Sequence, residues 1–237
     1  MKEKSLFVII LFFSIIGCSS ENGDEKIPSS FNWETTTLEE AQIDEVQLSK
    51  AFTEAEKLYY IYSIIVIRHG KIAAEKYFNG FDEYSDCSIR SVSKSYLSAA
   101  YGLAIQNNIL SLDDKLTEII EEYNSDIIDL RFKEITIEDL ITMKAGLDGD
   151  QNIYSTVVNS THWLRTIFGM QLINNPGEKF KYTTPGTHLL SAALTKVSGI
   201  SSLEFLEKNL ITKMNIDLVD WDRDPQGIYF GGNNMYF

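Results

Sequence analysis

Residues 89–96 read IRSVSKSY, and residues 97–112 continue as LSAAYGLAIQNNILSL. The second stretch has no charged side chain, so it predicts a buried helix that carries Lys94 near its start. A cation in the first turn of a helix is disfavoured by the helix dipole. Burial against an apolar helix further disfavours the charged form of the amine. Both effects push Lys94 toward a neutral amine.

Ser91 lies three positions before Lys94, and residues three apart at a helix start share a face with Cβ atoms roughly 5–6 Å apart. The Lys94 amine can therefore reach the Ser91 hydroxyl. A neutral amine is a suitable base for a serine nucleophile, and the N–H groups of a helix N-terminus can stabilise an oxyanion. The alternative is an exposed Lys94 beside an ordinary cap formed by Ser91 or Ser88.

Composition limits the classes of function. The chain has 237 residues, 44% of them hydrophobic, which is enough for one or two domains with a sizeable core. Its 21 basic and 34 acidic residues give a formal net charge of −13. Such a charge repels phosphate backbones, so we expect no nucleic acid partner.

The N-terminus predicts export. Lys2 and Lys4 precede the apolar run LFVIILFFSIIG, which is too short to span a bilayer comfortably but suits a secretory signal. The ending IIGC resembles the bacterial lipobox, which implies a lipoprotein signal peptide over residues 1–18 and a lipid on Cys18. The alternatives are a plain signal peptide or a short membrane anchor. We therefore expect a lipid-anchored protein of the cell envelope, on the periplasmic or cell-surface side.

Residues 19–36 are polar, acidic and rich in turn formers, which predicts a flexible linker. Beyond Cys18 the only cysteine is Cys87, so no internal disulfide is available. The three histidines are far apart in the sequence, without the spacing of a metal site. We expect neither a metal nor a cofactor.

The chain then predicts a helix, a hairpin and a long helical region. Asp44 heads the first helix, and a β-hairpin covers residues 62–81 with its turn at His69, Gly70 and Lys71. Further helices are expected after the Thr136 and Asp139 caps and over residues 162–173, 185–199 and 202–214. Almost no strand is expected after Phe78, which leaves a two-stranded hairpin that is marginal alone.

Several segments together resemble one family. They are YSIIVIRHGKIAAEKYF (62–78), IRSVSKSYLSAA (89–100), ITIEDLITMKAGL (135–147), NPGEKFKYTTPGTHLLSAALTKVSG (175–199) and WDRDPQGIYFGG (221–232). In this order they resemble the SxxK serine hydrolases: class C-like β-lactamases, penicillin-binding D,D-peptidases and related esterases and aminohexanoate-dimer hydrolases. The resemblance implies an α+β fold over residues 37–237, with an antiparallel sheet, a helical domain and the site between them.

The resemblance also implies roles for residues. Ser91 would be the acyl-accepting nucleophile, with Lys94 and Tyr182 transferring protons, and whether lysine or tyrosinate is the base stays open. Thr184 stands where the family has an asparagine that binds the substrate carbonyl, and a hydroxyl lacks the amide's paired geometry. The substrate would be a small molecule or short peptide with an amide, ester or β-lactam bond.

The family's third motif, Lys-Thr-Gly or His-x-Gly, has no match after Tyr182. We therefore expect a C-terminally incomplete version of the domain that is weakly active or inactive. The competing hypothesis is a non-catalytic surface lipoprotein that senses or binds penicillin.

Overall fold

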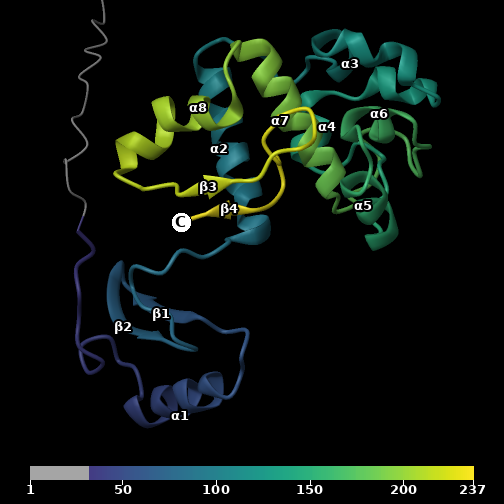
Figure 1. The fold of residues 1–237 in the computed structure, drawn as a ribbon. Helices are drawn as coiled ribbons and strands as arrows, with labels where there is room; N and C mark the ends of the chain where they lie inside the picture. The colour runs from purple at the N-terminus through teal and green to yellow at the C-terminus, as the bar shows by residue number, and fades with distance from the viewer. Residues whose placement is uncertain (1–31) are drawn as a thin grey trace, which may run out of the picture.

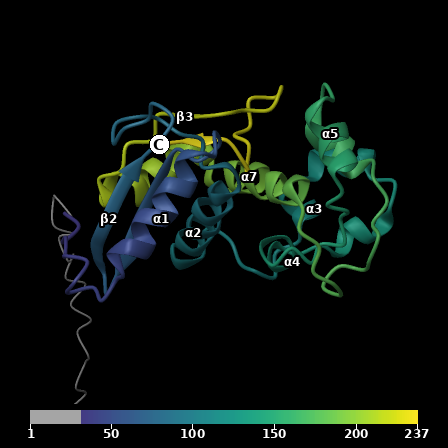
Figure 2. The same ribbon diagram turned by 90° about the horizontal axis from the view of Figure 1, so that it is seen from below.

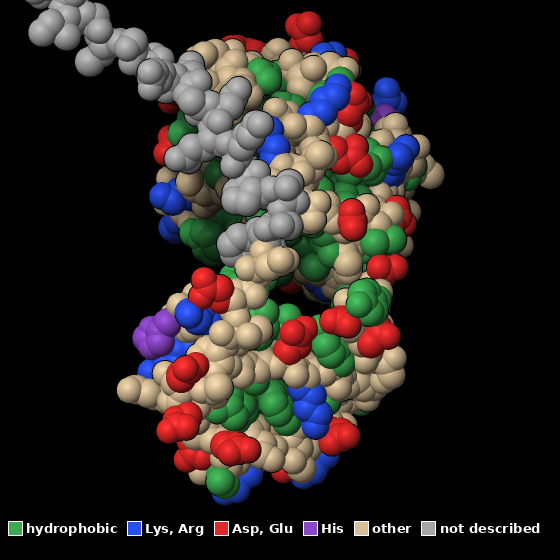
Figure 3. Space-filling model, turned by 90° about the vertical axis from the view of Figure 1, so that its left-hand side faces the viewer, with side chains coloured by type: hydrophobic (Ala, Val, Ile, Leu, Met, Phe, Trp, Pro, Cys, Tyr) green, Lys and Arg blue, Asp and Glu red, His purple; other side chains and the backbone are tan. Residues whose placement is uncertain are grey.

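The computed structural model describes residues 32–237, which form two parts (Figure 1). The smaller part contains α1 (Glu45–Glu56) and an antiparallel hairpin of β1 (Ser63–Arg68) and β2 (Lys71–Tyr77). Figure 3 shows it as a separate mass below the larger, mainly helical part. The fold is therefore mixed α and β, as the sequence predicts, although its sheets are small.

The larger part is built around two helices, α2 (Ser93–Gln106) and α7 (Thr184–Ser198), which pack against each other (Figure 2). The buried Tyr101 hydroxyl of α2 donates a hydrogen bond to the Leu190 carbonyl of α7 at 2.7 Å. The remaining elements are η1 (Arg90–Val92), α3 (Leu116–Ile119), η2 (Glu121–Asp126), η3 (Leu130–Glu134), α4 (Ile137–Ile141), α5 (Gln151–Val158), α6 (Trp163–Phe168), α8 (Ser202–Leu206), η4 (Glu207–Ile211), η5 (Thr212–Met214), β3 (Asp220–Trp221) and β4 (Met235–Tyr236).

The predicted hairpin is confirmed. Its register pairs Ser63 with Tyr77 and Arg68 with Lys71. The two turn residues, His69 and Gly70, both have positive φ, at 52° and 75°. This is the backbone of a type I′ turn, whose twist matches that of the flanking strands.

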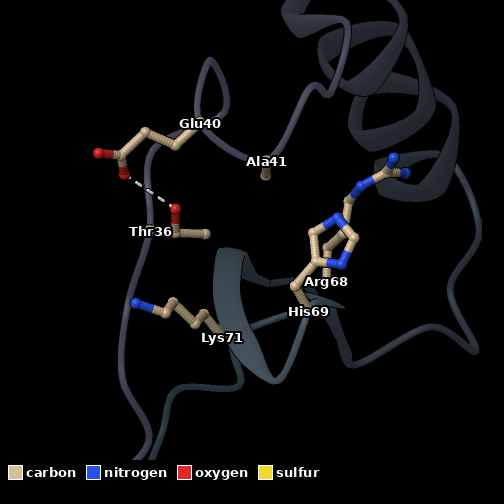
Figure 4. Close-up of a pocket in the computed structure, with 6 residues that line it drawn as sticks. All are labelled: Thr36, Glu40, Ala41, Arg68, His69 and Lys71. Carbon is tan, nitrogen blue, oxygen red and sulfur yellow. Dashed lines mark hydrogen bonds between the residues drawn. The ribbon is translucent and has the colours of Figure 1, made fainter.

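The chain before α1 lies along the hairpin. The Thr36 amide donates to the Ile72 carbonyl at 2.9 Å, and the Ile72 amide donates to Glu34 at 2.8 Å. Paired backbone therefore begins inside the stretch that we expected to be linker up to residue 36. A shallow pocket lies between this segment and the hairpin turn (Figure 4), and it is lined by Thr36, Glu40, Ala41, Arg68, His69 and Lys71. The expected signal peptide and Cys18 lie outside the described residues and stay predictions.

Local capping signals predict two helix starts correctly. Asp44 accepts a hydrogen bond from the Gln47 amide at 3.0 Å at the start of α1. Thr136 and Asp139 form a reciprocal capping box at the start of α4, with both bonds present. Each box bond satisfies an N–H group that a helix start leaves unpaired.

The predicted set of helices needs three corrections. The helix α5 was not predicted, although Asp150 caps it by accepting from the Asn152 amide at 2.7 Å. The helix expected over 162–173 is only α6 (Trp163–Phe168), for which Gly169 is the C-cap. Residues 202–214 form not one α-helix but α8, the π-helical turn η4 and the 3₁₀ turn η5.

The C-terminal segment forms strand structure that we did not expect after Phe78. β3 and β4 pair antiparallel, and β4 continues alongside the chain that leads into α2. The Ile89 amide donates to the Met235 carbonyl at 3.0 Å, and the Cys87 amide donates to the Phe237 carbonyl at 2.9 Å. The Phe237 ring stacks on Tyr96 with centroids 4.9 Å apart. The last residues therefore brace the start of the central helix.

Within residues 32–237, no single helix has the length and apolar character to cross a membrane. The pair formed by Thr184–Ser198 and Ser202–Met214 meets that test only jointly, across a 75° bend.

A buried carboxylate organises the far end of the helical part. Asp129 is 7% exposed and accepts hydrogen bonds from Arg131 and from the Leu172 amide, the latter at 3.0 Å. Arg131 also donates to the Leu172 carbonyl at 2.5 Å. The hydrogen bonds from Arg131 lower the pKa of Asp129 more than burial raises it. The ionised carboxylate therefore ties η3 to the loop after α6.

We expect Asp129→Asn to lower the free energy of unfolding at pH 7. Because the pKa of Asp129 is depressed by folding, its stabilising effect is complete above the unfolded value of about 4 and is lost as the pH falls through the folded value. Urea unfolding at several pH values measures this effect. The gap between parent and variant should close on acidification, and a gap that stays constant down to about pH 2 would contradict the assignment.

Candidate active site

Ser91 lies in η1, the tight turn that leads into α2, and its side chain is exposed. The residue before it, Arg90, has a φ of 49°, which is uncommon for a residue with a side chain. Ser93 stabilises this turn: its buried hydroxyl donates to the Arg90 carbonyl at 2.6 Å and accepts from the Met235 amide at 3.2 Å. A strained turn held from two sides presents Ser91 to solvent.

The Lys94 amine is half-buried and contacts three oxygens. Its Nζ lies 3.3 Å from Ser91 Oγ, 3.2 Å from Thr184 Oγ1 and 2.5 Å from the Gly232 carbonyl oxygen. A carbonyl can only accept a hydrogen bond, whereas a hydroxyl can donate or accept. A neutral amine has two N–H groups and one lone pair. It can therefore donate to Gly232 and Thr184 while its lone pair accepts the Ser91 proton.

Tyr182 completes the group. Lys94 Nζ lies 4.9 Å from the centroid of the Tyr182 ring, and Tyr182 is 45% exposed. Burial lowers the pKa of Lys94, against a smaller opposing effect of Tyr182. Burial raises the pKa of Tyr182, but its interactions with Ser91 and Lys94 together outweigh burial and lower that pKa below its usual value. The two groups titrate as a pair.

The position of Tyr182 is set by the chain that precedes α7. The Lys181 amide donates to the Met143 carbonyl at 2.8 Å, and the Thr183 hydroxyl donates to the Asp148 carbonyl at 3.2 Å. Gly149 permits this approach, since a Cβ there would lie 1.6 Å from the Tyr182 carbonyl oxygen. Thr183 also caps α7 by accepting from the Gly186 amide. The segment 175–199, which carries Tyr182, is thereby anchored on the loop that follows α4.

A pocket of about 310 Å³ opens over these groups. The structure brings together Ser91, Lys94, Tyr182 and Thr184, all of which the sequence singles out. The lining residues are Ser91, Gly149, Gln151, Tyr154, Tyr182, Thr184, Pro185 and Asn233. We did not predict the contributions of Gln151, Tyr154 and Asn233.

Gly232 is the main residue that sequence reasoning missed. A Cβ at Gly232 would lie 2.3 Å from Thr187 Oγ1 and 3.1 Å from Lys94 Nζ. The glycine therefore lets the backbone approach α7 closely enough for its carbonyl to reach Lys94. The Gly-Gly pair at 231–232 was a usable signal, because paired glycines mark places where a backbone passes close to another element.

One expectation about the helix start is only partly met. The Val92 amide donates to the Ile89 carbonyl at 3.0 Å, and the Ser93 amide donates to the Arg90 carbonyl. These two N–H groups close the turn around Ser91, so they are not free donors for an oxyanion. Among the described residues, no group of three or more His, Cys, Asp or Glu side chains is placed to hold a metal ion.

A sequence model of the beta-lactamase family matches residues 62–228. The chain therefore belongs to the beta-lactamase family, which confirms the resemblance inferred from its motifs.

Two curated relatives show the extent of the match. The chain is 26% identical over 183 residues to an uncharacterized protein from Alkalihalophilus pseudofirmus, covering 69% of this chain and 48% of that protein. It is 24% identical over 166 residues to Protein flp from Staphylococcus aureus, covering 65% of this chain and 33% of that protein. The chain thus spans half or less of the length of these relatives.

Solved structures show the same fold. A candidate 6-aminohexanoate-dimer hydrolase from Bacillus anthracis has a TM-score of 0.66 and 13% identity, over 88% of this chain and 59% of that chain. The octameric penicillin-binding protein homologue from Pyrococcus abyssi has a TM-score of 0.63 and 20% identity, over 82% and 53%. A class C beta-lactamase has a TM-score of 0.61 and 16% identity, over 81% and 60%.

The fit of Gly232 against α7 yields a prediction. Gly232→Ala should lower the free energy of unfolding by about 2 kcal/mol, because its methyl group overpacks the contact with Thr187. Gly102→Ala is the matched control, since a Cβ at Gly102 in α2 meets nothing within 4 Å. The control should be stabilised by about 0.5–1 kcal/mol. Urea unfolding of both variants measures the difference, and equal behaviour would show that the close approach is not a constraint.

Proposed function

We propose that this domain is a serine hydrolase that forms an acyl-enzyme on Ser91, with Lys94 and Tyr182 transferring the protons. The observation that supports this most directly is the set of three oxygens around Lys94 Nζ, two of which can take its N–H groups. This leaves the amine lone pair for the Ser91 hydroxyl. Membership of a family of hydrolases supports the same reaction class.

In the first half-reaction Ser91 Oγ attacks the substrate carbonyl carbon while its proton moves to Lys94 or, through it, to Tyr182. The carbonyl π electrons move to oxygen and form a tetrahedral oxyanion. Either group can take the proton, because burial disfavours the ammonium of Lys94 and nearby donors favour the phenolate of Tyr182.

Collapse of the oxyanion breaks the bond to the leaving nitrogen or oxygen. Tyr182, which borders the pocket, then gives that atom a proton. Where Lys94 took the Ser91 proton, Lys94 passes it to Tyr182; where Tyr182 took it, Tyr182 returns to the phenolate. In the second half-reaction water hydrolyses the ester on Ser91. The water loses a proton to the same pair and attacks the acyl carbon, and Ser91 Oγ leaves and takes back a proton as the acid is released. The pair ends each cycle in its starting protonation state.

The substrate class follows from the pocket and from Thr184. No Asp, Glu, Lys or Arg side chain is among the lining residues, and the pocket volume of about 310 Å³ suits a small acyl group. Thr184 Oγ1 is occupied by Lys94 at 3.2 Å, and it has one hydroxyl proton where an amide would have two N–H donors. Among the amide, ester and β-lactam bonds that the family resemblance implies, we favour a small ester, which needs the least help in holding its carbonyl.

The test is covalent labelling of the full chain by a fluorophosphonate and by a fluorescent penicillin, followed by mass analysis of the tryptic peptide that contains Ser91. We expect fluorophosphonate labelling of the parent and none at this peptide in Ser91→Ala. Lys94→Met should lower the labelling rate by about 100-fold, since it removes the base. If Ser91→Ala is labelled as fast as the parent, the proposal is wrong.

A lysine outside the pocket supplies the control. Lys196 lies near the end of α7 and pairs with Glu122 at 3.0 Å, on the surface. Lys196→Met should keep the labelling rate of the parent. Incubating the unlabelled chain with a p-nitrophenyl ester separates turnover from sensing: a hydrolase releases product repeatedly, whereas a penicillin-sensing protein keeps a stable acyl group on Ser91.

A further inference from the structure

A second buried polar pair lies outside the pocket, between α7 and the loop that follows β3. His188 Nε2 lies 3.0 Å from Asp224 Oδ2, and both side chains are fully buried. A carboxylate only accepts hydrogen bonds, so the proton between them belongs to Nε2 of the imidazole. Neither residue has a part in the reaction proposed above.

Asp224 is the organising group of its loop. Its Oδ1 accepts hydrogen bonds from the Gln226 amide at 2.8 Å and the Ile228 amide at 2.9 Å. Its own amide donates to the Ile228 carbonyl at 2.8 Å. The bond from His188 joins this loop to α7 through the Asp224 side chain. The Gln226 side chain joins the same loop to the start of α6, where it accepts from the Trp163 amide at 3.2 Å.

Aromatic rings enclose the pair. The imidazole of His188 meets the ring of Trp163 edge to face, with centroids 5.0 Å apart, and the ring of Phe230 at 5.9 Å. Such packing excludes water from the hydrogen bond, which makes loss of either partner costly. The His188 ring therefore packs against the Phe230 side chain, whose backbone is also held by Asp222 and Trp221.

The loop leads directly into the site. Phe230 is followed by Gly231, where a Cβ would lie 3.1 Å from the His188 Cα, and then by Gly232, whose carbonyl accepts from Lys94 at 2.5 Å. His188 also lies one helical turn after Thr184, the other acceptor of the Lys94 amine. The first turns of α7 thus contain Thr184 and, through His188 and the loop, also hold Gly232 in place.

We propose that His188 and Asp224 are a positioning pair, which holds the Gly232 carbonyl against the Lys94 amine and keeps water away from that amine. This inference rests on the proposed function only because that function makes Lys94 a proton-transferring group. Without the pair, the loop loses its hydrogen bond to α7. The 230–232 backbone, which the Trp221 indole still ties to β3, then moves away from α7, and Lys94 exchanges a fixed carbonyl for water. Because burial is the main cause of the lowered pKa of Lys94, that pKa then rises toward the value of an exposed lysine.

Few other groups can produce such a change. The titratable group that faces Lys94 is Tyr182, whereas Ser91, Thr184 and Gly232 are neutral partners. Around the pair, Trp163 and Phe230 are neutral, and Tyr123 of η2 is near enough to Asp224 for their charges to interact.

The experiment is a pH titration of Lys94 in the full chain, read from the ¹³Cε signal of labelled lysine and assigned by its loss in Lys94→Met. In His188→Leu we expect the midpoint to rise by about one pH unit, and in Asp224→Asn to rise in the same direction. Asp224→Asn retains an oxygen for the Gln226 and Ile228 amides, so the loop keeps its internal bonds. His188→Gln can still donate from Nε2 and should restore the midpoint of the parent.

Asp129→Asn is the matched control, because it also removes a buried carboxylate that ties a loop in place, yet its residue does not line the pocket. It should lower stability without moving the Lys94 midpoint. Near-ultraviolet circular dichroism verifies that each variant is folded. The inference is overturned if the midpoint stays within about 0.3 pH unit in both pair variants, or moves equally in the control.

The titration also separates this inference from the proposed function. It reads the protonation of Lys94 without any turnover or acylation. A parent chain that no probe labels at Ser91 refutes the proposed hydrolase, while a Lys94 midpoint that depends on His188 still supports the positioning pair. If Ser91 is labelled at equal rates in the parent and in His188→Leu, and the Lys94 midpoint does not move, the proposed hydrolase activity stands. The role of His188 and Asp224 as a positioning pair is then refuted.

Discussion

The half-buried amine of Lys94 is the constraint around which the site is arranged. An ammonium loses hydration energy when it leaves water, and residues 32–237 offer it two neutral hydroxyl groups and one carbonyl but no carboxylate. Three separate parts of the chain must meet to supply those oxygens: the turn before α2, the start of α7 and the segment before β4. The packing of the helical part can be understood as the means of keeping them together.

The sequence predicted those structural features that depend on interactions between residues close together in the chain. The hairpin follows from two β-rich runs around His69 and Gly70, which adopt positive φ as a tight turn requires. The box of Thr136 and Asp139 starts α4 because both partners lie within one turn. The pairing of Ser91 with Lys94 was accessible for the same reason, since the two residues are three positions apart.

What sequence reasoning missed depends on contacts between distant residues. β4 has only two residues, and no propensity marks so short a strand; it exists because Met235 pairs with Trp221 and bonds to the chain around Ile89. Gly232 contacts Lys94 across 138 positions, and the pair of His188 and Asp224 spans 36. The family resemblance was needed to connect Tyr182 with Ser91, because nothing local links them.

The brace of β4 on the entry to α2 has a consequence for biosynthesis. The Ser93 hydroxyl, which stabilises the turn that carries Ser91, accepts its hydrogen bond from a residue 142 positions later. A ribosome makes the nucleophile long before it makes that donor, so the turn lacks one of its two supports while the residues between them are made. Contacts of such sequence separation form late and slowly. A growing chain therefore cannot complete this centre until nearly every described residue has left the exit tunnel.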